Sequence, residues 1–280
     1  MLFNKNAVIT GGARGIGFAI AKELVSRGAK VVICSRTKSD LEKALVNLNQ
    51  DREVAYGILC DVSNLSSCKK LIKFAKVKLK RIDILVNNAG IYGPIGAFEK
   101  INLKEWEKAL HINFMGMVYC SYLVIPEMEK SGAGKIINLC GAGVGGKSLP
   151  RFSAYFSSKF AVAGFTEVLA DELKDENIQV NSISPGGVNT YINEYLLKQG
   201  PKKTGKEMYE QALEQKKTGG IPPELAAKLV AFLASDESSH ITGRLLSAKW
   251  NSPESLKKVK FSNSLYKLRR IDQELFYEKK

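Results

Sequence analysis

Two side chains with complementary proton chemistry lie four positions apart near the middle of the sequence. Tyr155 and Lys159 belong to the segment YFSSK at the start of an expected helix, so both project from one face. A free tyrosine has a pKa of about 10, and a neighbouring ammonium group favours its phenolate form. Such a tyrosine can exchange a proton with a carbonyl or alcohol oxygen. The pair therefore predicts acid–base chemistry with Tyr155 as the proton carrier.

A glycine-rich segment near the N-terminus could hold a phosphate group. In TGGARGIG, residues 10–17, Gly11, Gly15 and Gly17 allow a tight turn and a close approach of the backbone, and Ile16 lies between the last two. The helix expected to begin here offers free N–H groups to a pyrophosphate. A tight turn without a ligand is the alternative. The position between the first strand and the first helix favours dinucleotide binding.

The end of the second expected strand discriminates between the two nicotinamide dinucleotides. An acidic side chain there would bond the ribose 2′-hydroxyl group and repel a 2′-phosphate. The sequence has Ser35 and Arg36 instead, and Arg14 lies in the glycine-rich segment. Two guanidinium groups can hold a phosphate through forked hydrogen bonds, although Arg36 would also suit a solvated helix start. The sequence predicts NADP, with NAD as the alternative.

Short β-branched runs alternate with amphipathic stretches along the chain. Strands are expected at residues 7–10, 30–34, 54–59, 83–88, 135–140, 178–184 and 244–248. Helices are expected near residues 15–27, 38–49, 64–80, 104–130, 153–174 and 222–234. This alternation predicts an α/β fold, a doubly wound Rossmann-type sheet of mostly seven parallel strands. Such sheets bind ligands beyond the carboxyl ends of their strands, where the candidate motifs fall.

The chain is expected to form a single domain with a C-terminal extension. Residues 1–248 would be a dinucleotide-binding oxidoreductase domain. Within it, the polar segment 191–221 is broken by glycines and prolines and is expected to be a helical insertion that covers the substrate. Residues 249–280 would be a basic tail.

Six motifs follow one another in the order and at the spacing of a known family. They are TGGARGIG (10–17), Asp61-Val62, NNAG (87–90), Asn113 in HINFMG, YFSSK (155–159) and SPGGVNT (184–190). Over residues 5–248 the sequence resembles the short-chain dehydrogenase/reductase family. The resemblance implies a seven-stranded doubly wound sheet, a nicotinamide cofactor and a homodimer or homotetramer.

The resemblance also assigns roles to individual residues. It implies that Lys159 bonds the nicotinamide ribose and that Asn113 supports a water chain that carries the proton onward. The remaining cofactor contacts that it implies are Asp61 and Val62 at the adenine, Asn88, Ala89 and Gly90 at the ribose, and Pro185, Gly186, Val188 and Thr190 at the nicotinamide end.

The sequence departs from the family pattern at the catalytic serine. Its position falls on Gly141 or on Ala142, depending on which motif anchors the count, and neither carries a hydroxyl group. Losing a preorganised donor typically costs a factor of about 10²–10³ in rate, less than the whole of enzymatic catalysis. A backbone N–H of the glycine-rich GAGVGG, the Cys140 thiol, Ser148 or a hydroxyl of the substrate could take its place. A second departure, Ala248-Lys249-Trp250 before a long tail, puts the usual subunit packing in question.

Composition limits the kind of protein. Hydrophobic residues make up 45% and charged residues 25%, as in ordinary soluble globular chains. The most apolar run, 114–125, stops at Pro126 and is too short to span a membrane, and a strand begins too early to leave room for a signal peptide. Five cysteines without CxxC spacing and two histidines argue against disulfides and metal ligation, so Cys34 and Cys60 are expected to be small core residues. A cytoplasmic location is expected.

The net charge of +14 requires an explanation. Nucleic-acid binding is one hypothesis, but the lysines are spread along the chain and the basic run 69–81 suits a helix with a solvated side. Attraction of anionic ligands is a simpler one. Together with the polar insertion, it suggests a small-molecule substrate that is anionic or polyhydroxylated.

These observations favour an NADP(H)-dependent oxidoreductase that acts on a carbonyl or secondary alcohol. The alternative is a catalytically silent family member that senses NADP(H) or serves as a scaffold. Because Asn113, Tyr155 and Lys159 are all present, the first hypothesis is preferred.

Overall fold

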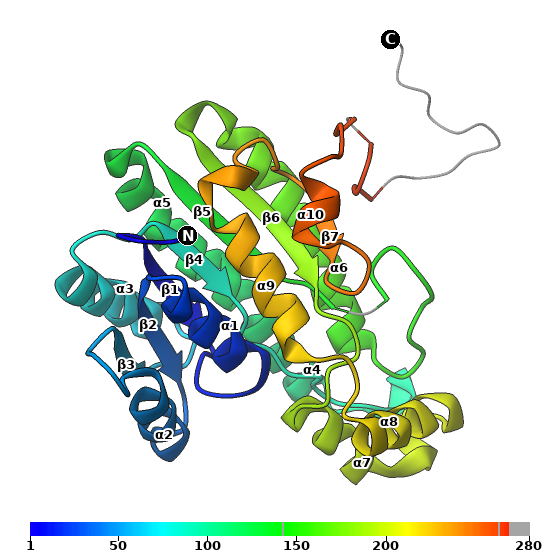
Figure 1. Cartoon of the computed structure of the whole chain (residues 1–280). Helices are drawn as coiled ribbons and strands as arrows, with labels where there is room; N and C mark the ends of the chain where they lie inside the picture. Colours follow the sequence, from blue (N-terminus) through cyan, green and yellow to red (C-terminus); the bar gives the residue numbers. More distant parts are fainter. Residues whose placement is uncertain (142, 263, 269–280) are drawn as a thin grey trace.

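A parallel sheet of seven strands forms the centre of the molecule. The computed structural model describes residues 1–141, 143–262 and 264–268 (Figure 1). The strands are β1 (Asn6–Thr10), β2 (Lys30–Ser35), β3 (Ala55–Leu59), β4 (Ile84–Asn87), β5 (Gly134–Leu139), β6 (Ile178–Ser184) and β7 (Leu245–Ser247). Their order in the sheet is β3-β2-β1-β4-β5-β6-β7. Because β1 pairs with both β2 and β4, the winding direction reverses at β1, which places the ligand crevice beyond its carboxyl end.

Helices cover both faces of the sheet. They are α1 (Gly15–Ser26), α2 (Lys38–Leu48), α3 (Leu65–Leu79), α4 (Leu103–Leu110), α5 (Gly116–Ser131), α6 (Ser153–Glu172), α7 (Tyr191–Thr204), α8 (Lys206–Thr218), α9 (Pro223–Leu233) and α10 (Pro253–Leu256). One core packs α1, α2, α9 and α10 against the sheet, and α1 and α9 lie side by side in Figure 1. A second core packs α3, α5 and α6 against the other face. The predicted doubly wound α/β fold is confirmed.

The central strands are buried on both sides, as the apolar runs in the sequence indicate. Every residue of β4 and of β5 is buried, which is the pattern of a parallel sheet between two helical layers. Such strands hold their ends rigidly, so the loops that follow them can position functional side chains.

The helical run that follows β4 continues through Pro126, in agreement with the helix expected near residues 104–130. Residues 103–131 run continuously through α4, a π-helical turn (His111–Met115) and α5. Pro126 and Tyr122, whose carbonyl loses its partner at the proline, are both exposed, so water can satisfy that carbonyl.

Among the described residues, Leu103–Ser131 is also the one helical run with the length and composition to cross a membrane. Its most apolar window has a mean hydropathy of 1.3 and is 44% buried inside the fold. The expectation that no stretch is apolar enough over this length was wrong, although in the fold the run packs against α3 and α6.

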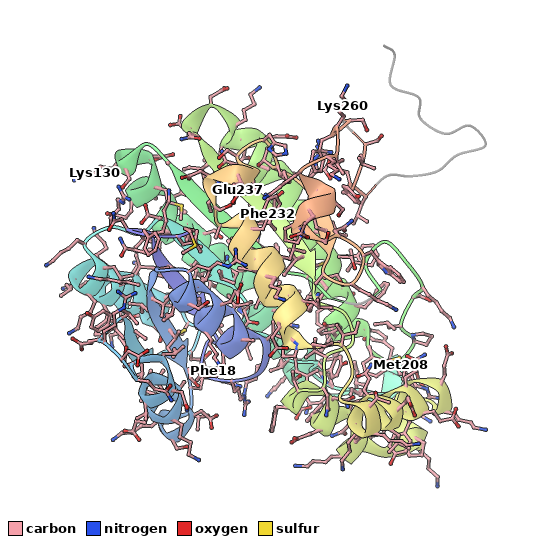
Figure 2. The ribbon with its side chains drawn as sticks, viewed as in Figure 1. Phe18, Lys130, Met208, Phe232, Glu237 and Lys260 are labelled. Carbon is pink, nitrogen blue, oxygen red and sulfur yellow. The ribbon has the colours of Figure 1, made fainter. Side chains whose placement is uncertain are left out.

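The expected insertion forms the two helices α7 and α8. They pack against each other, and Gly200 interrupts α7 with a φ of 75° that an L side chain rarely adopts. In Figure 1 the pair lies beside α4, at the end of the molecule to which β6 points. In Figure 2, Met208 marks this end, far from Lys130 at the end of α5.

The described part of the C-terminal extension packs onto the domain. Leu256 is fully buried in the core beneath α9 and α10, and the backbone N–H of Leu245 donates to Tyr266 O at 2.8 Å beside β7. The Arg244 guanidinium donates to the carbonyls of Ser262 and Leu265, each at 2.7 Å. Residues 269–280 of the predicted basic tail lie outside the described residues.

Candidate active site

The glycine-rich loop is tied to the end of β4 by side chains at the end of β1. The Thr10 hydroxyl accepts the backbone N–H groups of Asn88 (3.0 Å) and Ala89 (3.1 Å). The Asn88 amide donates to the carbonyls of Thr10 (2.9 Å) and Gly11 (3.0 Å). A Cβ at Gly17 would overlap the Gly11 carbonyl and the Asn88 amide, so this position requires glycine. The loop is therefore held by these hydrogen bonds, and its backbone passes too close to Asn88 for a side chain at position 17.

The loop opens into a cavity that suits a dinucleotide phosphate. Gly15 begins α1 with a positive φ of 54°, and no side chain caps the helix, so its first N–H groups are free to bind an anion. The cavity has a volume of about 790 Å³ and extends from the ends of β2 and β3 to the loop after β4. The residues present fit a nicotinamide dinucleotide, whose phosphates would lie at α1.

Most of the predicted cofactor residues line this cavity. They are Gly11, Arg14, Gly15, Ile16, Gly17, Ser35, Arg36, Asp61, Val62, Asn88, Ala89, Gly90 and Thr190. Its walls do not include Tyr155, Lys159, Pro185, Gly186 or Val188. Gly186 instead gives room to Ile221, and Val188 is buried in an isolated bridge with Gly220. Of the SPGGVNT stretch, Asn189 and Thr190 reach the wall.

At the ends of β2 and β3, where the family resemblance would place the adenine (the adenine end of the cavity), arginine side chains lie near carboxylates. Arg14 lies 3.5 Å from Asp40 and stacks 4.1 Å above the centre of the Tyr191 ring. Burial would raise the pKa of Asp61, but hydrogen bonds from the Ser63 hydroxyl and N–H, together with the charge of Arg36, lower it overall. Asp61 is therefore an anion that can accept hydrogen bonds from an adenosine group.

Two of the three predicted catalytic residues, Asn113 and Lys159, come together behind Gly90. The Asn113 amide accepts the Ile91 N–H and donates to the Ile91 carbonyl, both at 2.8 Å, because the π-helical turn directs it at the loop after β4. It also donates to Ser158 at 2.9 Å. A Cβ at Gly90, on the cavity wall, would lie 3.3 Å from Asn113 Oδ1 and 3.6 Å from Lys159 Nζ. Asn113 and Lys159 thus lie directly behind the wall.

Burial controls the protonation of Tyr155 and Lys159. It raises the pKa of Tyr155 well above its usual value, with a further rise from Tyr92 and Cys140. Burial likewise lowers the pKa of Lys159 to about 8, and its Nζ donates to the Leu139 carbonyl at 2.7 Å. That Nζ lies 5.8 Å from the centre of the Tyr155 ring. In the chain alone, burial therefore outweighs the lowering expected from the lysine.

At Gly141, one of the two candidates for the serine position, the Tyr155 ring leaves no room for a side chain. A Cβ at Gly141 would collide with the Tyr155 hydroxyl and lie 2.9 Å from its Cζ. The neighbouring Cys140 is buried, and its thiol donates to the Lys159 carbonyl at 3.3 Å, so it cannot turn toward a substrate without losing that bond. Ala142, the other candidate for the serine position, lies outside the described residues.

A family model described as short chain dehydrogenase matches residues 5–200, more than half of the chain. The chain belongs to the short-chain dehydrogenase/reductase family. As a member, it is an NAD(P)-dependent oxidoreductase.

Relatives of similar length carry the same assignment. The protein is 33% identical over 255 residues to dehydrogenase/reductase SDR family member 4 of Mus musculus, with 91% of this chain and 89% of the relative covered. The Caenorhabditis elegans protein of that name is 35% identical over 245 residues, with 86% and 92% covered.

Among solved structures of similar fold, one contains NAD⁺ and another contains NADPH. NAD⁺-bound xylitol dehydrogenase has a TM-score of 0.79 at 28% identity, covering 88% of this chain and 98% of that chain. An actinorhodin polyketide ketoreductase with NADPH has a TM-score of 0.79 at 26% identity, covering 88% and 97%.

Sequence reasoning about this short-chain dehydrogenase/reductase missed two residues beside the predicted three. The Tyr92 ring lines the cavity and packs edge-on against Tyr155 with 4.8 Å between ring centres. Ser158 accepts from Asn113 and donates to the Tyr155 carbonyl at 2.7 Å. Both could have been found, since Tyr92 directly follows NNAGI and Ser158 lies inside YFSSK.

Among the described residues, no group of three or more His, Cys, Asp or Glu could hold a metal ion.

Proposed function

We propose that this protein is an NADPH-dependent reductase of apolar carbonyl compounds, in which Tyr155 delivers the proton. The observation that carries the proposal is the position of Asn113 and Lys159 directly behind the wall of a dinucleotide-shaped cavity, with the Tyr155 ring packed against Tyr92 of that wall. Bound NADPH would supply the hydride. The chain would then supply the proton that the resulting alkoxide requires.

The raised pKa of Tyr155 supports the reductive direction. A buried neutral tyrosine keeps its proton at physiological pH and can donate it to an alkoxide. Alcohol oxidation would instead need the phenolate, which burial disfavours. The ammonium group of Lys159 would stabilise the negative charge that develops on Tyr155 as it gives up its proton. Asn113 holds the loop around Ile91 in place.

Arg14 and Arg36 support the preference for NADPH. Both side chains line the cavity together with Ser35, at the point where an acidic residue would reject a 2′-phosphate. Arg14 is about half exposed and is held only by Asp40 and Tyr191, so it can turn to a phosphate at small cost.

The surroundings of Tyr155 favour an apolar substrate over the anionic or polyhydroxylated one that the net charge suggested. Tyr155 packs in a cluster of apolar and aromatic side chains from four segments of the chain. Its members are Tyr92, Ile95, Leu149, Phe152, Tyr195, Leu196, Leu197, Met208 and Ala212. Two of these residues, Tyr92 and Tyr195, also line the cavity. A substrate beside Tyr155 would therefore meet aromatic rings, which gain free energy from burying hydrocarbon and offer few partners for sugar hydroxyls.

We also propose a cytoplasmic homodimer or homotetramer. The exposed side chains of Tyr122, Phe160 and Val168 leave apolar surface on α5 and α6, which a second copy could cover. All five cysteines are free and buried, as suits a reducing compartment.

A substrate panel tests the proposed function. NADPH consumption would be followed with aromatic and aliphatic ketones, with sugars and with acyl thioesters. We expect turnover with the apolar ketones. Turnover confined to sugars would contradict the substrate class, and NADPH binding without any turnover would favour the silent sensor.

A further inference from the structure

Four cysteines cluster beneath the adenine end of the cavity. Cys34 is the penultimate residue of β2, Cys60 follows β3, and Cys68 and Cys120 lie on α3 and α5. All four are buried in the core between the sheet and these helices. Only Cys34 and Cys60 also line the cavity. The proposed mechanism uses neither of these two thiols, although both lie at the wall of the cofactor cavity.

The hydrogen bonds around Cys60 make its sulfur an acceptor. The Ser67 hydroxyl accepts the backbone N–H of Asp61 at 3.1 Å and lies 3.4 Å from the Cys60 sulfur, to which it donates its one proton. An accepting sulfur is stabilised in its thiolate form, which is the nucleophile of a cysteine. Cys60 is also at the cavity wall, so a small molecule can reach it.

The other cysteines lack this combination. The neighbouring Cys34 and Cys68 thiols and the Ser67 hydroxyl lower the pKa of Cys60, although burial opposes them. The pKa of Cys34 is raised by its bond to Cys60 and by burial. Burial raises the pKa of Cys140 to about 11, and its thiol is occupied with the Lys159 carbonyl.

We propose that Cys60 is a covalent modification site for soft electrophiles, such as α,β-unsaturated carbonyl compounds, and that bound cofactor closes it. The thiolate sulfur attacks the β-carbon, a C–S bond forms and the C=C π bond breaks. The α-carbon then takes up a proton in place of the one that the thiol released to solvent. The adduct would occupy the adenine end of the cavity and block the dinucleotide.

The experiment uses the full chain and N-ethylmaleimide as the probe. Cofactor-free native protein would be treated with limiting reagent, and the modified peptides would be identified by mass spectrometry. We expect the first adduct on Cys60, with the four other cysteines as internal controls. Saturating NADPH should slow the modification by about tenfold or more, because it occupies the same space. Adducts on other cysteines while Cys60 stays free would overturn the proposal.

Two further arms separate this inference from the proposed cofactor preference, on whose cavity it rests. NADH would be tested as a second protectant, since protection by NADH alone would contradict the NADPH preference and leave Cys60 as the site. Dinucleotide binding would then be measured before and after treatment for the wild type and for Cys60→Ser. We expect treatment to abolish binding by the wild type and to leave the variant at its own starting value. Full binding by protein that carries the Cys60 adduct, or no protection by either dinucleotide, would refute it.

Discussion

The Tyr155 hydroxyl lies where a side chain at position 141 would begin. A Cβ at Gly141 would collide with this hydroxyl and lie 2.9 Å from Cζ of the same ring. The tyrosine can therefore occupy this position only because residue 141 has no side chain. Gly141 gives the phenol its space.

Gly141→Ser should lower activity rather than restore it. The new side chain would displace the phenol, and we expect kcat for the native substrate to fall by about tenfold or more, as expected when a reacting group is misplaced. Gly146→Ala is the matched control, because the nearest atom to its added Cβ is 4.0 Å away. A clear gain in turnover by Gly141→Ser would contradict this expectation and show that the enzyme merely lacks the serine hydroxyl.

The fold could be predicted from the sequence because its signals are local. β-Branched runs and glycine turns located all seven strands, and α1 begins at Gly15 as the GxxxGxG spacing predicts. The exposure of Pro126, which lets the expected helix continue through it, could not be predicted, because it depends on which side of the helix faces water.

The candidate site was predictable in its residues but not in its electrostatics. Spacing placed Tyr155 and Lys159 on one helical face, and their positions agree with it. The balance between burial and the lysine charge depends on the packing of Tyr92 and on the bond from Lys159 to Leu139, both distant in sequence. The thiol environment of Cys60 likewise requires Ser67 of a different element.

Arg36→Asp should reverse the cofactor preference. We expect the wild type to bind NADPH more tightly than NADH by about tenfold or more, which is 1.4 kcal/mol. The carboxylate would repel the 2′-phosphate and bond the ribose of NADH. Arg52→Asp makes the same charge change at an exposed site before β3 and should leave the ratio unchanged. Fluorescence titration measures the constants, and equal wild-type affinities would contradict the assignment.

Asn113→Ala should damage both stability and activity. It would leave the buried N–H and carbonyl of Ile91 without their partner, at a cost of about 1–3 kcal/mol. Chemical denaturation would measure this loss. The loop beside Gly90 would also loosen, so kcat should fall. Asn47→Ala, at an exposed helical position, should change stability by less than about 0.5 kcal/mol. Equal effects of the two substitutions would refute a positioning role for Asn113.

Lys159 should make stability depend on pH in the alkaline range. Burial lowers its pKa from 10.5 in the unfolded chain to about 8 in the folded chain, so the folded chain binds this proton less tightly. Burying the charged lysine costs stability below about pH 8, and the cost disappears as pH rises toward 10.5.

Lys159→Met removes this cost, so its stability relative to the wild type should be highest near pH 7. The difference should fall by up to about 3 kcal/mol by pH 10. Denaturation at several pH values measures it. Lys22→Met, at an exposed lysine of α1, should give a constant difference. A constant difference for Lys159→Met as well would show that the charge is not buried.

Tyr155→Phe tests the central claim most directly, since it removes the hydroxyl and keeps the ring. NADPH affinity and turnover of a ketone substrate would be measured for this variant and for Tyr122→Phe, a tyrosine exposed on α5. We predict that Tyr155→Phe lowers kcat by about 10²–10⁴ and leaves NADPH affinity nearly intact, because a general acid is lost. Tyr122→Phe should behave as the wild type. Turnover by Tyr155→Phe at the wild-type rate would contradict the proposed mechanism.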